Sequence, residues 1–231
     1  MNWLIKALSS SIGKKFVMAL TGLLLCGFLV VHLAGNFLLY VGPSAYNKYA
    51  HSLHSQEWFV KIAEGGLVIL FGAHILLAIG TAAENRRARR VAYHTKVSKL
   101  DVVNTAFGAP FKAESWMLWS GIIVLGFLLV HLSDFTLGLR LKGPEGEEPF
   151  TKAVRILNDN WSFWIYIVGS IVLGIHLTHG LASAFQSLGI NHPKYNTLIR
   201  WFSIGFGIVI GVGFALFPVW RALLYQSPGA G

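Results

Sequence analysis

Five long apolar segments constrain the fold of this 231-residue chain more than any other feature. A helix needs about 20 residues, each adding about 1.5 Å, to cross the hydrocarbon core of a membrane. The five segments cover roughly residues 16–41, 59–82, 116–137, 161–185 and 198–224. The polar segments between them contain Gly and Pro, which is typical of turns between helices. The sequence therefore predicts an all-α integral membrane protein with one domain of five transmembrane helices.

Composition and charge agree with a membrane location. Apolar residues make up 54% of the chain and charged residues only 13%. In soluble domains, about a quarter of all residues are charged. The 19 Lys and Arg residues exceed the 10 Asp and Glu residues, but they lie between the apolar segments, which argues against nucleic-acid binding. Twelve of them precede the first segment or lie in the second and fourth connections, and six lie in the other connections and the tail. The positive-inside rule predicts that the N-terminus lies in the cytoplasm and the C-terminus outside. We expect the membrane to be the bacterial cytoplasmic membrane.

The first and third segments are internally similar. Residues 21–33, TGLLLCGFLVVHL, align without gaps on residues 120–132, SGIIVLGFLLVHL. The alignment matches Gly22 with Gly121, Gly27 with Gly126 and His32 with His131. LFGAHIL around His74 also resembles VLGIHLT around His176, so the first two segments are interpreted as repeated in the third and fourth.

One histidine in each repeated segment predicts a metal-binding function. Polar side chains inside the hydrocarbon region are costly and usually functional. Counted from the predicted segment ends, His32 and His131 lie roughly 10 Å further out than His74 and His176. Neutral imidazoles on facing helices are good axial ligands for haem iron. The first four segments are therefore predicted to form a bundle that binds two b-type haems, one between each pair.

Four glycines fit this arrangement. Gly22 and Gly121 are predicted to lie level with the inner haem, and Gly66 and Gly169 level with the outer one. Small residues let a flat cofactor or a neighbouring helix approach the backbone closely. Ordinary helix packing would also account for them.

Three further polar residues lie near the inner ligands. His179 is one turn from His176 and competes with it as a ligand, but the Gly-x-His pattern shared with the second segment favours His176. His179 is then expected to hydrogen-bond a haem propionate. Thr81 and Ser183 each follow a ligand by seven residues, and either could bind a propionate or its own helix.

Several motifs resemble a known family. They are GKK, TG and HLAGN in the first segment, AYNKYAHSLHS after it, HLSD in the third and HLTHGLASAFQSLG in the fourth. Over nearly the whole chain they resemble the membrane anchor of succinate dehydrogenase and fumarate reductase, in its five-helix, di-haem cytochrome b form. In that family His32 and His131 correspond to the ligands of the outer haem, and His74 and His176 to those of the inner haem.

The resemblance implies partners as well as cofactors. A flavoprotein and an iron–sulfur subunit would bind on the cytoplasmic side, in a complex that could form a higher oligomer. Electrons would pass from the iron–sulfur centres through the inner and outer haems to a quinone, with menaquinone the usual choice. The basic connection from Glu84 to Glu114 is expected to contact lipid headgroups and the iron–sulfur subunit. The chain has no flavin motif or Cys cluster, so the dicarboxylate chemistry is assigned to other chains, and its direction stays open.

Five polar residues are candidates for an outer quinone site, which needs a proton donor near the haem edge. Asn47, His51 and His54 share one face of a predicted short interfacial helix. Asp134 follows His131 by one turn, and Glu64 lies near the outer end of the second segment. Each could instead be a solvated or helix-capping residue.

Three alternative functions remain. The nearest is a di-haem b subunit of another respiratory, quinone-linked complex, although cytochrome b of the bc complexes usually carries two ligands on each of two helices. A proton or metal transporter would need acids along a path through the membrane, and only Glu64 is clearly inside. The third is a structural anchor with vestigial haem pockets.

Overall fold

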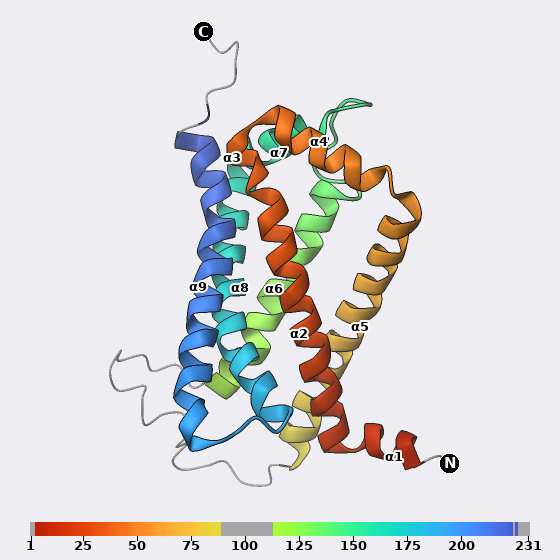
Figure 1. The fold of residues 1–231 in the computed structure, drawn as a ribbon, viewed down its shortest axis with the longest axis vertical. Coiled ribbons are helices and arrows are strands. Elements are labelled where there is room, and N and C mark those ends of the chain that lie inside the picture. Colours follow the sequence, from red (N-terminus) through yellow and green to blue (C-terminus); the bar gives the residue numbers. More distant parts are fainter. Residues whose placement is uncertain (1–2, 89–112, 224, 226–231) are drawn as a thin grey trace.

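Five long helices form the body of the protein in the computed structural model, which describes residues 3–88, 113–223 and 225. They are α2 (Ser11–Asn36), α5 (Glu57–Ala88), α6 (Ala113–Phe135), α8 (Asn160–Ser187) and α9 (Pro193–Leu223) (Figure 1). All five are long and apolar enough to cross a membrane. The predicted all-α architecture with five spans is therefore confirmed.

Four short helices lie at the ends of the bundle. Helix α1 (Trp3–Ser9) lies at one end, and α3 (Leu38–Val41), α4 (Pro43–His54) and α7 (Pro149–Asn158) lie at the other, where α9 finishes (Figure 1). We call the end with α1 the inner end and the opposite end the outer end, following the predicted orientation. Helix α4 contains the short helix that the sequence predicted around Asn47.

The first long helix differs from its predicted bounds at both ends. It begins at Ser11 because the Ser10 hydroxyl accepts a hydrogen bond from the backbone N–H of Gly13 at 3.1 Å. It ends at Asn36, although the apolar sequence continues into α3. Gly42, with a φ of +118°, then turns the chain into α4. The length of an apolar segment shows how much of the chain can lie in the hydrocarbon layer of the membrane. Capping hydrogen bonds and turns determine where the helix itself begins and ends.

The outward surfaces of the long helices are apolar. On α5, Val68, Ile69 and Leu76 are 72–73% exposed. Soluble proteins rarely expose continuous apolar surfaces of this kind, whereas lipid covers them at no cost. The chain is a multi-pass membrane protein with five candidate spans.

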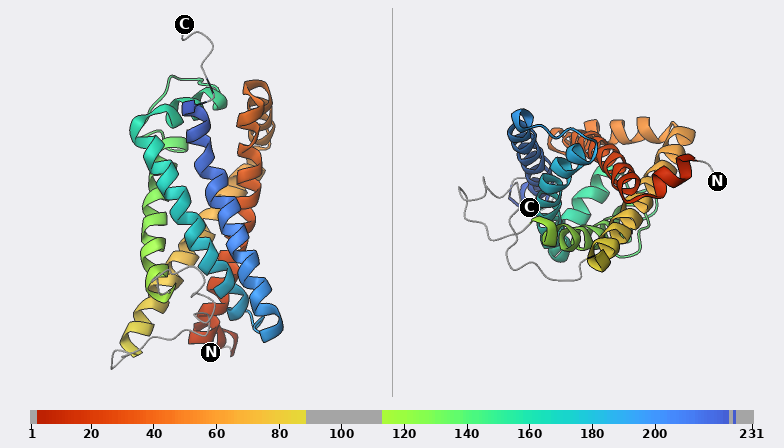
Figure 2. Two further views of the ribbon diagram at one scale, coloured as in Figure 1. Left: turned by 90° about the vertical axis from the view of Figure 1, so that its left-hand side faces the viewer. Right: turned by 90° about the horizontal axis from the view of Figure 1, so that it is seen from below.

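The first four spans surround an interior, and the fifth packs outside α8 (Figure 2). Helix α2 packs against α5, α8 and α9, and α6 packs against α8. Helices α8 and α9 approach each other closely, since a Cβ added to Gly174 would lie 2.6 Å from the carbonyl oxygen of Gly207. Small residues at such crossings let membrane helices pack tightly.

Helix α7 lies in the third connection, which the sequence predicted only as a polar link between spans. It begins at Pro149, and its N–H of Phe150 donates to the Asn47 side chain of α4 at 2.8 Å. Its buried side chains are Phe150, Ala153, Val154, Ile156 and Leu157. Their helical spacing forms one apolar face, so this connection covers the outer end of the bundle. By contrast, most of the basic connection between Glu84 and Glu114 lies outside the described residues, and its predicted contacts with lipid and an iron–sulfur subunit stay predictions.

Candidate functional site: paired histidines between the spans

The outer histidines come together from α2 and α6. The ring centres of His32 and His131 are 5.9 Å apart, and the ring planes are inclined by 82°. Aromatic rings surround both, and they belong to Phe28, Phe127, Phe135, Tyr166 and Phe214. Within the described part of the chain, neither histidine ring forms a hydrogen bond. Both imidazoles therefore keep a nitrogen lone pair free for another partner.

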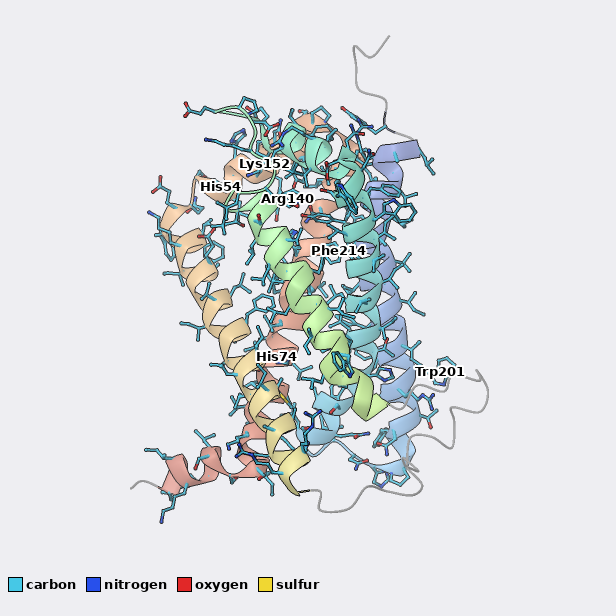
Figure 3. All side chains as sticks on the ribbon, turned by 180° about the vertical axis from the view of Figure 1, so that it is seen from behind. His54, His74, Arg140, Lys152, Trp201 and Phe214 are labelled. Atoms are coloured by element: carbon cyan, nitrogen blue, oxygen red, sulfur yellow. The ribbon has the colours of Figure 1, made fainter. Side chains whose placement is uncertain are left out.

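The inner histidines are held by hydroxyl groups. His74 of α5 places Nδ1 3.3 Å from the Thr21 hydroxyl of α2. His176 of α8 places Nδ1 3.0 Å from the Ser120 hydroxyl of α6. Because Thr21 and Ser120 occupy matching positions in the two repeats, their contacts place His74 and His176 at the same level. His74 lies in the inner half of the bundle, whereas Phe214, which contacts His32, lies in the outer half (Figure 3).

Glycines lie directly beside the inner histidine rings. A Cβ added to Gly22 would lie 3.3 Å from Cε1 of His74, and one added to Gly121 would lie 3.5 Å from Cε1 of His176. The first distance is shorter than ordinary van der Waals contact, so any larger side chain would displace the ring. Both glycines thus lie at the inner level that the sequence analysis gave them.

The two levels are spaced equally in both repeats. Thr21 precedes His32 by eleven residues, and Ser120 precedes His131 by eleven. Eleven residues make almost three whole turns, so the hydroxyl and the histidine share one face of their helix, about 16 Å apart along its axis. This rise along one helix is larger than the roughly 10 Å that the sequence predicts between the two histidine levels.

The donor set favours a cofactor that brings its own equatorial ligands. Among the described residues, no group of three or more His, Cys, Asp or Glu side chains could hold a metal ion. Two imidazoles on opposite sides of one metal, each with a bond of about 2 Å, have ring centres about 6 Å apart. The 5.9 Å between His32 and His131 fits this arrangement, which a haem iron uses.

The other residues predicted near the haems occupy different environments. Thr81 is 8% exposed and its hydroxyl has no hydrogen-bond partner among the described residues, so this buried polar atom could bind a ligand. Ser183 is exposed, and His179 is partly buried without the hydroxyl contact that His176 has. Gly169 packs against the Phe127 ring, and Gly66 faces open space.

The quinone-site candidates fall into separate groups. Asn47 binds the start of α7, and Nε2 of His51 lies 2.9 Å from the carboxylate of Glu148. His54 is exposed and Nδ1 contacts the carbonyl of its own helix at Ala50. Glu64 is exposed on α5. No hydrogen bond or ion pair joins these four to the fifth candidate, Asp134, in the described part of the chain, so one shared quinone pocket stays a prediction.

Asp134 is the centre of a polar cluster at the outer end of α6 and α8. It is fully buried, and its carboxylate accepts hydrogen bonds from Nε and Nη2 of Arg140 at 2.8 and 2.6 Å and from the Tyr166 hydroxyl at 3.0 Å. Arg140 also contacts Asp159 and Ser162 of the next helix. These hydrogen bonds, led by the one to Asp134, raise the pKa of Arg140. Every oxygen of Asp134 is therefore already occupied.

The same cluster fixes the start of α8 and one outer histidine. Asp159 caps α8 by accepting the N–H of Ser162 at 2.9 Å, and this hydrogen bond is the main cause of its lowered pKa. Tyr166 contacts Asp134 through its hydroxyl and the His131 ring through its own ring, with centres 6.0 Å apart. Arg140 and Lys152 lie together near the outer end of α6 (Figure 3), where Lys152 donates to the carbonyl of Phe135 at 2.7 Å.

Sequence reasoning missed four residues of these sites. Thr21 and Ser120 head the two aligned repeats, and their matching hydroxyls were the available signal. Arg140 was counted only as an outer positive charge, although it follows an intramembrane acid by six residues. Tyr166 carried no signal of its own, since its role depends on how α8 packs against α6.

Comparisons with protein-family models, curated proteins and solved structures found no match to this chain. The resemblance to the anchor of succinate dehydrogenase therefore stays a hypothesis. Support for a function has to come from the paired histidines and their surroundings.

Proposed function

We propose that this chain is the di-haem cytochrome b membrane anchor of a succinate:quinone oxidoreductase. It would carry electrons between an iron–sulfur subunit and a quinone, with menaquinone the expected acceptor. The observation that carries the proposal is the arrangement of four intramembrane histidines as two pairs at two levels, with no third donor beside either pair among the described residues.

The donor chemistry supports haem rather than another metal. Non-haem sites for zinc or iron usually need three or four protein ligands. A b-type haem supplies four nitrogens itself and, when bound, accepts and releases one electron at a time. His32 and His131 would hold the outer haem, and His74 and His176 the inner one. The unpartnered Thr81 hydroxyl lies two turns inward of His74, where it can donate to a haem propionate.

The surroundings of the histidines also suit electron transfer. Aromatic side chains surround the outer pair, and all four histidines are partly buried between the helices. Water exclusion keeps the environment of a redox centre fixed and limits side reactions. The partner flavoprotein and iron–sulfur subunits would bind at the inner end, on the cytoplasmic side of a bacterial membrane.

Haem content and ligand variants test the cofactor assignment. The purified complex is expected to contain two b-type haems per chain. His32→Ala and His131→Ala should each remove the same half of the reduced b-type absorption, and His74→Ala and His176→Ala the other half. His192→Ala, which changes an exposed histidine outside all the candidate sites, is the matched control and should keep both haems. A haem-free wild-type complex, or variants that pair differently, would contradict the assignment.

Succinate-driven reduction tests the reaction. In the purified complex, succinate should reduce both haems, and added menaquinone should then reoxidise them. Complete absence of reduction by succinate, with both haems present and reducible by dithionite, would exclude succinate as donor. The result would then favour the alternative of a di-haem subunit from another quinone-linked respiratory complex.

A further inference from the structure

Two hydroxyl groups at matching positions hold the inner histidines. Thr21 and Ser120 are 7% and 4% exposed, so neither hydroxyl relies on water for its hydrogen bonds. Each belongs to the helix that also supplies an outer histidine. The inner histidines that they contact come from the partner helices α5 and α8.

Each hydroxyl also lies within hydrogen-bond distance of a backbone carbonyl on its own helix. A hydroxyl has one proton to donate and can also accept. Thr21 donates to backbone carbonyls one turn back, with Oγ1 3.0 Å from the oxygens of Val17 and Met18. Ser120 donates to the carbonyl of Met117 at 3.1 Å. Each hydroxyl therefore acts as the acceptor toward histidine, so Nδ1 of the histidine carries the proton.

The tautomer leaves the other ring nitrogen ready for a metal. With Nδ1 protonated, Nε2 of His74 and His176 has the free lone pair. Histidines that bind metals almost always donate their second ring N–H to a nearby acceptor, which fixes the tautomer, orients the ring and raises its basicity. Gly22 and Gly121, next to the two hydroxyls, leave the space that each ring occupies.

We infer that Thr21 and Ser120 are positioning residues that fix the tautomer and orientation of the two inner haem ligands. The inference rests on the proposed haem function. One helix of each repeat would then have two roles. Helices α2 and α6 each supply a histidine to the outer haem and a hydroxyl that holds the inner ligand of a neighbouring helix. The outer ligands lack such a partner among the described residues, so this support is specific to the inner level.

Ser120→Ala is the sharper of the two possible tests, because Ser120 lies 3.0 Å from His176, whereas Thr21 lies 3.3 Å from His74. In the purified complex, Ser120→Ala should lower the affinity for the inner haem by roughly 10- to 100-fold. This would be measured as faster transfer of that haem to an excess of apomyoglobin. The inner haem should also show a changed low-spin electron paramagnetic resonance signal and a higher midpoint potential, because its ligand becomes less basic. The outer haem should be unchanged in all three measurements.

Two companion variants separate positioning from packing. Ser203→Ala removes another buried hydroxyl that donates only to its own helix, at 2.8 Å from the carbonyl oxygen of Ile199, and should change neither haem. Ser120→Thr keeps the hydroxyl and should restore the wild-type signal. An inner haem unaffected by Ser120→Ala, or lost equally in Ser120→Ala and Ser120→Thr, would overturn the positioning role while leaving the haem function intact. A wild-type complex with no haem would overturn both.

Discussion

At the scale of single residues, the buried carboxylate of Asp134 depends on one cation. Arg140 binds both of its oxygens, and the arginine side chain is itself 29% exposed. Removing one partner therefore leaves the other in a different environment, depending on which of the two is removed. Without Arg140 the carboxylate stays buried and unpaired, whereas without Asp134 the guanidinium still reaches solvent and Asp159.

We expect Arg140→Ala to destabilise the protein more than Asp134→Asn does. Removing one partner of a buried ion pair costs about 3–5 kcal/mol when the remaining charge cannot reach water. Asp134→Asn keeps an acceptor for Tyr166 and should cost about 1–3 kcal/mol. The midpoint of thermal unfolding in one detergent would measure both.

Lys142→Ala provides the control for this comparison. It removes an exposed positive charge from the same connection, so its unfolding midpoint should stay close to that of the wild type. Equal losses for Arg140→Ala and Lys142→Ala would mean that the contacts of Arg140 contribute little to stability.

At the scale of helices, the contact between α8 and α9 depends on glycines, which have no side chain. A Cβ on Gly207 would meet the Gly174 carbonyl and Thr178 of α8, and one on Gly211 would lie 3.0 Å from the Cα of Gly174. Backbone atoms cannot move aside as the end of a flexible side chain can. The attraction between these helices is therefore van der Waals contact and not the hydrophobic effect, because lipid is as apolar as the helices.

Gly207→Leu should consequently separate α8 from α9. We expect a loss of about 1–3 kcal/mol or more from overpacking, seen as a lower thermal midpoint and lower yield of folded protein. Gly205→Leu is a close control, because Gly205 lies on the same helix but faces open space. If both variants unfold at the same temperature, the close approach described for Gly207 is wrong.

Sequence predicted the long helices well and their surroundings less well. A span of 20 apolar residues has few alternatives in a membrane, because every backbone polar group must be satisfied within the helix. Helix α7 escaped prediction because its apolar face is short and lies between turn-forming residues. The cluster around Asp134 escaped because it joins three chain segments, and only packing brings Arg140 to the carboxylate. The histidine positions were readable, since each is a polar residue in an apolar segment, but their hydroxyl partners required the contact between helices.

At the scale of the whole molecule, a repeated sequence is packed unequally. Both repeats hold an inner histidine by a hydroxyl, from α2 to α5 and from α6 to α8. Yet α8 lies against α2, α6 and α9, whereas α5 packs chiefly on α2. The unpaired fifth helix accounts for much of this difference, because it covers α8 and has no counterpart beside α5. Each inner histidine thus has a hydroxyl partner, but the helix that carries His176 packs against more neighbours than the helix that carries His74.

A helix that crosses the membrane has its two ends on opposite sides, and for α5 this gives a topology prediction. Ser52 of α4 is exposed at the outer end, and Asn85 is exposed near the inner end of α5. In a Cys26→Ala background, Ser52→Cys should react with a membrane-impermeant maleimide in intact spheroplasts. Asn85→Cys should react only after lysis, because the excess of basic residues keeps that end in the cytoplasm.

Each other labelling pattern has a distinct meaning. Reversed labelling would leave the fold intact but invert the orientation, so the iron–sulfur partner could not bind from the cytoplasm at the inner end. Labelling of both cysteines in intact spheroplasts would mean that α5 does not cross the membrane, and His74 could then not lie in the hydrocarbon region opposite His176. The topology experiment therefore tests the inner histidine pair independently of any haem, because only a crossing α5 can bring His74 to the depth that Thr21 sets on α2.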